Sequence, residues 1–146
     1  MQHDLVIKGG QVVTASEIFV ADVGVSGGKI ATLGSDLSGN EVIDATNKLV
    51  MPGGIEAHCH IAQESGMGLM SADDYETGSI SAAFGGNSCF VPFAAQKVGQ
   101  SVAQTLSTYD GRASTKSVID YSYHLILTDP NADVLAELPG VFERGI

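Results

Sequence analysis

The sequence predicts an α/β protein in which a β-rich segment, residues 1–52, precedes about three βα units in residues 53–146. Two observations point to this class. Short apolar stretches separated by glycine turns fill the first segment, and strand-like and helix-like stretches alternate after Pro52. Because an open parallel sheet of three strands would leave its edges unprotected, we expect these units to be the first part of a larger (β/α)8 barrel of about 250 residues.

The first segment is predicted to form short strands joined by tight turns, without a helix. Gly9-Gly10 lies between two apolar runs and has the composition of a hairpin turn. A second turn is expected at Ser26-Gly27-Gly28. The expected strands cover residues 4–8, 11–14, 18–25, 29–33 and 41–45.

Strands and helices are predicted to alternate after Pro52. Ser71 or Asp73 is expected to cap the first helix, because a short side-chain oxygen accepts the free amide hydrogens of the first turn. Gly85-Gly86 is expected to end that helix. The expected order is a strand over 53–60, a loop over 61–71, a helix over 75–84, a strand over 87–93, a helix over 98–112, a strand over 117–127 and a helix over 131–142.

The segment His58-Cys59-His60 carries the clearest chemical signal. It ends the strand that is expected to follow Pro52. Because residues i and i+2 of a strand point to the same face, both imidazoles are expected to converge while Cys59 points away. Two neutral imidazoles on one face are half of a divalent metal site. From the spacing alone, a metal pair and two strand histidines that pack or face water remain equally open interpretations.

Composition excludes several classes of protein. A net charge of -10 leaves no basic patch to neutralise phosphate, so we expect no nucleic-acid partner. The two cysteines are too few for a disulfide framework and fit a reducing cytoplasm. The sequence contains neither a basic and apolar leader nor an apolar run of membrane-spanning length. We therefore expect a cytoplasmic protein without a membrane partner.

Taken together, these features resemble the N-terminal portion of the dihydropyrimidinase and D-hydantoinase family, cyclic amidohydrolases among the urease-like metal-dependent hydrolases. A lone HxH pair is weak evidence, but HxH after a Pro-Gly-Gly-Ile strand and behind a β-rich module with this glycine pattern is specific. The resemblance covers essentially the whole chain. The segments that carry it are residues 5–10, 22–25, 28–30, 42–45, 50–60, 72–78, 82–87 and 118–121.

The resemblance implies a composite β-sandwich, to which residues 1–52 contribute, beside a metal-centred TIM-like barrel that begins in residues 53–146. It implies that His58 and His60 help to hold two divalent ions, usually zinc, and that a bridging hydroxide opens a hydantoin or dihydropyrimidine ring. The carboxylated lysine, the two later histidines and the catalytic aspartate of the family match no position here. Catalytic and substrate-binding residues therefore stay unassigned. The resemblance also implies a homotetramer or homodimer.

The sequence departs from the family pattern around the histidine pair. Glu56 replaces a common aspartate, and Cys59 replaces a frequent threonine. Residues 61–66 also differ from the common segment, which borders the substrate pocket in relatives. These departures leave the substrate preference open.

The remaining histidines and cysteines have simpler interpretations. Cys59 and Cys89 are expected to be small buried hydrophobic residues. His124 lies in an apolar strand and is expected to be a hydrogen-bonded core histidine. His3 lies near the terminus and is expected to be exposed.

Two lysines and two acidic residues are further candidates for the site. Lys97 could face the barrel mouth and Lys116 precedes a strand at the wrong end, so neither is favoured as the bridging lysine. Glu64 and Asp73 could approach the pocket, but solvation for Glu64 and helix capping for Asp73 are simpler interpretations.

The function predicted from the sequence is hydrolysis of a cyclic amide C–N bond, by a longer enzyme of which this chain is the N-terminal part. The 146 residues alone are expected to be inactive, because two imidazoles are too few for a complete zinc site. Two alternatives remain: a non-catalytic dihydropyrimidinase-like assembly protein, and an inactive truncated relic. Retention of both His58 and His60 argues against the assembly protein.

Overall fold

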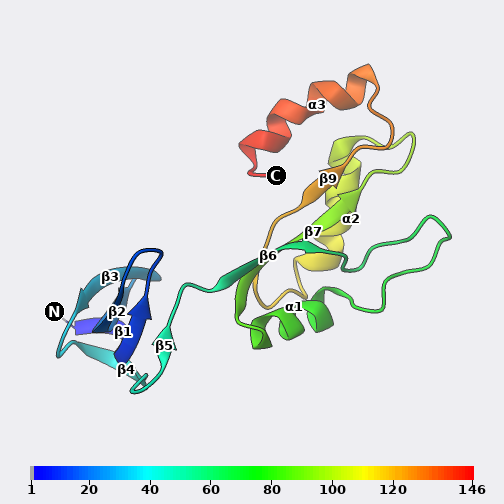
Figure 1. Cartoon of the computed structure of the whole chain (residues 1–146). Coiled ribbons are helices and arrows are strands. Elements are labelled where there is room, and N and C mark those ends of the chain that lie inside the picture. The colour runs from blue at the N-terminus through cyan, green and yellow to red at the C-terminus, as the bar shows by residue number, and fades with distance from the viewer. Residues whose placement is uncertain (1) are drawn as a thin grey trace. The chain divides into compact units, whose positions relative to one another are not determined.

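The computed structural model describes residues 2–146 and divides the chain into two compact units, Met1–Pro52 and Gly53–Ile146. Each unit has a β-sheet of its own, and all three helices belong to the second unit (Figure 1). The predicted α/β class is therefore confirmed. Among residues 2–146, no helix combines the length and the apolar composition needed to cross a membrane.

The first unit is a five-stranded mixed sheet in the order β3-β2-β1-β4, with β5 also paired to β1. Strand β1 pairs antiparallel with β2 and parallel with β4 and β5. A small core on this sheet contains Val6, Val12, Val23 and Ala45. The strands are β1 (Gln2–Val13), β2 (Ile18–Ser26), β3 (Lys29–Gly34), β4 (Ser38–Asp44) and β5 (Leu49–Val50).

The hairpin predicted at Gly9-Gly10 is wrong, because β1 continues through both residues as one strand. The glycines instead mark a register shift between β1 and β2, and Gly9 has the left-handed φ of +71° that glycine tolerates. The buried carboxylate of Asp22 accepts hydrogen bonds from the amides of Gly9 and Leu37, at 2.8 and 3.0 Å. A side chain from β2 therefore stabilises the irregularity without reversing the chain.

His3 is buried, contrary to the prediction that it is exposed. Its side chain is 2% exposed, and its Nδ1 lies 2.9 Å from the Ser26 hydroxyl. A Cβ atom placed on Gly24 would lie 2.7 Å from the His3 ring, so the ring occupies the space that this glycine leaves open. The prediction failed because the strand begins at Gln2, which buries a residue close to the terminus.

The second unit alternates strands and helices, as predicted. Strand β7 lies at the centre and pairs in parallel with β6, β8 and β9. The single strand expected over 117–127 is instead two short strands, β8 and β9. The elements are β6 (Gly54–Cys59), α1 (Tyr75–Phe84), β7 (Asn87–Ala95), α2 (Val102–Ala113), β8 (Asp120–Tyr121), β9 (His124–Ile126) and α3 (Ala132–Glu143).

The helix starts follow the side chains that cap them. Asp74, rather than Ser71 or Asp73, caps α1 by accepting hydrogen bonds from the amides of Glu76 and Thr77. Helix α2 begins at Val102 instead of residue 98, because Ser101 accepts from the amide of Gln104. In each case the oxygen closest to the first turn sets the helix start.

The three helices contribute side chains to one core on a single face of the second sheet. Alternation along β7 turns Phe90 and Ala94 toward this core and leaves Phe93 on the opposite face. One face of the sheet is therefore packed against the helices, and the helices do not cover the face that carries Phe93. The core residues from the helices are Tyr75 from α1, Val102, Leu106, Tyr109 and Ala113 from α2, and Val134 and Val141 from α3.

Gln96, directly after β7, hydrogen-bonds to the segment that follows β9. The side chain is 2% exposed, and its Oε1 accepts hydrogen bonds from the amides of Thr128 and Asp129 at 3.0 and 3.1 Å. Its Nε2 donates to the Gln100 carbonyl at 2.7 Å. Both polar atoms of the buried amide therefore have hydrogen-bond partners, and these bonds compensate the cost of removing Gln96 from water.

The carboxylate of Asp74 is expected to make stability depend on acid pH. A hydrogen bond from Lys116, at 2.5 Å, and the amide of Thr77 lower the pKa of Asp74 to about 2. Because the folded-state pKa lies below the usual value of about 3.9, the stabilisation is present above pH 4 and is lost as the pH falls toward 2. Between pH 5 and 2.5, the wild-type chain should lose more stability than Asp74→Asn, in which the cap stays but cannot ionise.

Urea unfolding followed by tyrosine fluorescence measures this difference. The chain has no tryptophan, and its four tyrosines all lie between residues 75 and 123, so the signal reports the second unit. The other carboxylates are common to both proteins and cancel in the comparison. Equal losses of stability in the two proteins would contradict the assigned role of Asp74.

Candidate metal-binding site

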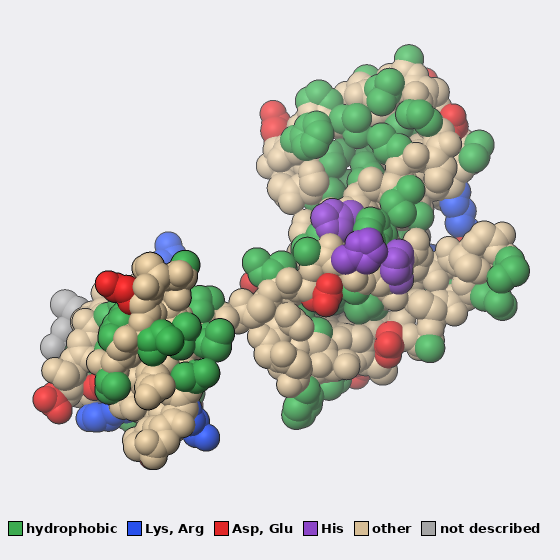
Figure 2. Space-filling view, in the orientation of Figure 1, with side chains coloured by type: hydrophobic (Ala, Val, Ile, Leu, Met, Phe, Trp, Pro, Cys, Tyr) green, Lys and Arg blue, Asp and Glu red, His purple; other side chains and the backbone are tan. Residues whose placement is uncertain are grey.

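His58 and His60 lie together at the carboxyl end of β6. Their ring centroids are 5.6 Å apart with an angle of 78° between the rings, and both side chains are exposed. The i and i+2 positions of the strand therefore bring the imidazoles to one face, as the strand pattern predicts. Figure 2 shows the histidine side chains gathered on one face of the second unit.

Phe93 from β7 supports both imidazoles. Its ring centroid lies 4.9 Å from that of His58, in an edge-to-face arrangement, and 5.0 Å from that of His60, in a stacked arrangement. These are favourable distances for aromatic pairs. The half-buried Phe93 thus limits the orientations available to the two rings.

An irregularity in the strand pairing lies next to the histidines. Glu56 pairs with Phe90 and Cys59 pairs with Pro92, so β6 has one residue more than β7 between these pairs. Pro92 has no amide hydrogen to donate to a neighbouring strand, and proline inside a sheet is found at such bulges. A bulge bends its strand and redirects its side chains. The extra residue falls in the Ala57-His58 segment.

The hydrogen bonding of His60 suits a metal ligand. Its Nδ1 lies 2.5 Å from Oε1 of Gln63, which can only accept, so Nδ1 carries the hydrogen and Nε2 keeps a free lone pair. Metal-binding histidines commonly donate their second ring N–H to an oxygen in this way. The His58 amide donates to the Glu56 carboxylate at 2.9 Å, which holds the backbone between the two residues.

The loop that follows His60 is fixed at its start. Ile61 and Ala62 are buried, and the Ala62 amide donates to the Asp73 carbonyl at 2.9 Å. The guanidinium of Arg112 donates to the Ala62 carbonyl at 2.7 Å. Ala62 also has a left-handed φ of +48°, which is uncommon without a glycine. These bonds hold the turn that brings Gln63 back to His60.

The two cysteines are half-buried free thiols, less buried than predicted. Cys59 packs against the core under the helices, on the side of the strand away from the imidazoles. Burial and the nearby Glu56 carboxylate raise the pKa of the Cys59 thiol to about 11. Because its side chain points into the core and away from the imidazoles, Cys59 is not placed to share a metal ion with them.

His124 is exposed on the face that carries Phe93, and the prediction of a core histidine is wrong in this respect. The expectation that it is hydrogen-bonded is correct, because Nε2 lies 2.8 Å from the Ala57 carbonyl. The prediction failed because the residues around His124 in the sequence are apolar, which suggested a strand buried on both faces. The neighbouring Tyr123 is buried, and the two-residue period of a strand therefore places His124 on the opposite, open face.

The candidate site in residues 2–146 offers two nitrogen donors, His58 and His60. In this part of the chain, no three His, Cys, Asp or Glu side chains lie close enough together to hold an ion. His58 and His60 fit a zinc ion as two nitrogen donors, and a catalytic zinc normally has three protein ligands. The arrangement of the two donors is therefore compatible with the metal, but the donors are too few to complete its coordination.

A cavity of about 430 Å³ adjoins His60 and is formed largely by the loop that follows it. Met67, Leu69 and Met70 give its wall an apolar character, and all three side chains are exposed. Ser65 accepts a hydrogen bond from the Leu69 amide, which closes the loop on itself. This surface provides apolar contacts beside the histidine pair.

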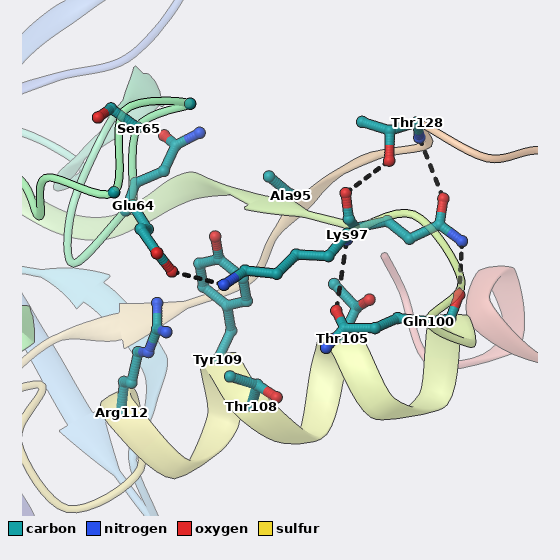
Figure 3. Close-up of a pocket in the computed structure, with 14 residues that line it drawn as sticks. Glu64, Ser65, Ala95, Lys97, Gln100, Thr105, Thr108, Tyr109, Arg112 and Thr128 are labelled. Carbon is teal, nitrogen blue, oxygen red and sulfur yellow. Dashed lines mark hydrogen bonds and ion pairs between the residues drawn. The ribbon is translucent and has the colours of Figure 1, made fainter.

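A second cavity, of about 660 Å³, lies between the end of β7 and α2 (Figure 3). Here Lys97 and Glu64 form an ion pair at 2.7 Å, which lowers the pKa of Glu64. Arg112 lies 4.9 Å from the ring centroid of Tyr109. Neither His58 nor His60 lines this cavity. This cavity is therefore separate from the two candidate metal-binding residues.

The candidate lysines and acidic residues, Lys97, Lys116, Glu64 and Asp73, are paired with other side chains or lie at a helix end. The Lys97 amine contacts Glu64, so Glu64 is not simply solvated. Lys116 contacts Asp74. Asp73 accepts a hydrogen bond from the Thr77 hydroxyl beside the cap of α1.

Curated proteins of similar sequence include D-hydantoinases and dihydropyrimidinases. The D-hydantoinase of Geobacillus stearothermophilus is 44% identical over 140 residues, which cover 94% of this chain and 30% of the relative. The dihydropyrimidinase of Rattus norvegicus is 38% identical over 134 residues, 87% of this chain and 26% of the relative. The chain spans about 30% of the length of the D-hydantoinases that it matches. No protein-family profile matches it.

Solved structures give the same result. A D-hydantoinase structure superimposes with a TM-score of 0.92 and 41% identity, over 98% of this chain and 31% of that chain. The dihydropyrimidinase from Brevibacillus agri NCHU1002 superimposes with a TM-score of 0.89 and 41% identity, over 96% and 31%. The resemblance inferred from the sequence motifs is confirmed.

Proposed function

Because this chain corresponds to the N-terminal portion of the D-hydantoinase and dihydropyrimidinase family, we propose that it forms part of a metal-dependent cyclic amidohydrolase. The observation that carries the proposal is the pair of exposed imidazoles, His58 and His60, at the carboxyl end of β6. In barrel enzymes, active sites lie at this end of the strands. The reaction is ring opening of a hydantoin or a dihydropyrimidine by water.

In this proposal, residues 53–146 are the first βα units of a (β/α)8 barrel, and residues 1–52 are one part of a composite β-sandwich. The parallel pairing of β6, β7, β8 and β9 supports the barrel. The first unit exposes a large apolar area, which supports a sandwich that further residues would complete. The exposed residues are Ile18, Val20, Ile30, Leu33, Val42, Ile43 and Leu49.

His58 and His60 are proposed to supply two nitrogen ligands to a zinc site that holds two ions in the complete enzyme. When bound, the metal would polarise the amide carbonyl and lower the pKa of a water molecule toward neutrality. This chain's own contribution is to orient the ligands. Gln63 holds the His60 tautomer that leaves Nε2 free, and Phe93 fixes the planes of both rings.

The apolar wall beside His60 is proposed to face the substituent of the substrate ring. Met67, Leu69 and Met70 offer apolar contact without fixed hydrogen bonds, which suits a small cyclic amide with an apolar side group. A homotetramer or homodimer is proposed from the same family. The free thiols of Cys59 and Cys89 support a reducing, cytoplasmic location.

The natural polypeptide that contains these residues provides the test. We expect a mass well above the 15.1 kDa of residues 1–146, bound zinc, and hydrolysis of hydantoin or dihydrouracil that a chelator abolishes and zinc restores. Release of the N-carbamoyl acid, followed by chromatography, measures the reaction. A zinc-free polypeptide with no hydrolysis of either compound would favour the assembly protein or the truncated relic.

A further inference from the structure

His124 joins two strands of the second sheet that do not pair with each other. It lies on β9, where it is the register partner of Phe93 on β7. Its Nε2 lies 2.8 Å from the carbonyl oxygen of Ala57 on β6, which is 67 residues away in the chain. Strands β6 and β9 both pair with β7, so this bond connects them across the central strand.

The chemistry of the bond fixes the direction of donation. A carbonyl oxygen only accepts, so Nε2 of His124 carries the hydrogen and is the donor. That nitrogen is therefore not free to bind a metal. His124 is thus distinct from His60, whose Nε2 keeps its lone pair.

The acceptor lies where β6 is irregular. Ala57 falls in the bulged segment between Glu56 and Cys59, directly before His58. A bulge interrupts the regular hydrogen bonds of a sheet, so its backbone depends more on bonds from outside the ladder. The N–H of His124 supplies such a bond to the peptide unit from which His58 projects.

Phe93 provides the second connection between His124 and the candidate ligands. The His124 ring lies 5.2 Å from the Phe93 ring, and Phe93 contacts His58 and His60 from the same face. The three imidazoles therefore surround one aromatic side chain. A change at His124 acts on the ligand pair through the Ala57 backbone and through this ring.

We propose that His124 is a positioning residue, whose hydrogen bond to the Ala57 carbonyl holds the β6 bulge in the conformation that aims His58 and His60 at a metal ion. The inference rests on the proposed function, because it takes these two residues to be zinc ligands. It assigns a role to a histidine that is not itself a ligand. Outer partners of this kind typically change metal affinity by about 10- to 100-fold.

Two substitutions separate the hydrogen bond from the ring. His124→Phe keeps an aromatic side chain against Phe93 but has no N–H, whereas His124→Gln keeps an N–H donor near the position of Nε2 but has no ring. In the natural polypeptide, His124→Phe should weaken zinc binding about 10- to 100-fold, and His124→Gln should retain most of the wild-type affinity. Ile126→Ala, two residues along the same face of β9, is the matched control and should bind as the wild type does.

Zinc affinity is measured by competition with a chelator, and the visible spectrum of the cobalt-substituted protein reports the ligand geometry. Weak binding and an altered spectrum in His124→Phe, with both restored in His124→Gln, would support the positioning role. Wild-type affinity in His124→Phe would overturn it, and so would equal losses in both variants. If His58→Ala and His60→Ala keep full zinc content, the proposed function itself fails, which is a different result.

Discussion

Replacing His58 or His60 with alanine is expected to remove most of the bound zinc and to lower hydantoin hydrolysis by at least about a hundredfold in the natural polypeptide. Each substitution deletes one of the two imidazoles on the open face of β6, whose ring centroids lie 5.6 Å apart. Loss of a residue that only hydrogen-bonds to a metal ligand already lowers metal affinity or activity by up to about a hundredfold. Loss of a ligand itself should lower them at least as much. Zinc per chain and the turnover rate are the two measurements.

Cys59→Ala is the matched control for this experiment. It changes the residue between the two histidines, but Cys59 packs toward the helices, on the side of β6 away from the imidazoles. Zinc content should therefore stay at the wild-type level. The double variant of His58 and His60 should be hardly worse than either single variant, because residues that act as one unit are not additive. Full zinc content in both single variants would exclude the pair as ligands.

The sequence was sufficient to predict what short-range periodicity determines. The alternation of strands and helices after Pro52 follows from local apolar spacing and turn residues, so α1 was predicted with its observed bounds, 75–84, although its cap was assigned to the wrong residue. The shared face of His58 and His60 follows from the two-residue period of a strand. Neither inference needs knowledge of a distant residue.

Features that depend on distant residues were missed. The bond from His124 to Ala57 joins positions 67 residues apart, and the bulge at Ala57 arises opposite Pro92 on another strand. Gly9 predicted a turn, but the carboxylate of Asp22, on the neighbouring strand, stabilises an irregularity in a continuous strand there. These features depend on the register in which neighbouring strands pair, and the residue pattern of a single strand does not specify that register.

Phe90→Ala is expected to cost about 3–5 kcal/mol in the free energy of unfolding of the second unit. Phe90 is fully buried, and its ring lies 5.9 Å from that of Tyr75. It occupies the centre of the core that α1, α2 and α3 share, so truncation removes buried apolar surface and leaves a cavity. Urea unfolding followed by tyrosine fluorescence measures the change.

Phe84→Ala is the control, because the same chemical change is made at a side chain that is 91% exposed at the end of α1. Its effect should stay within about 0.5 kcal/mol, since a surface substitution creates no cavity. A domain is stable by only about 5–15 kcal/mol, so the loss at Phe90 would remove a large part of that margin. Similar losses at Phe84 and Phe90 would mean that the helices do not form the described core on β7. The packed face of the sheet would then no longer account for the position of the strand end that carries His58 and His60.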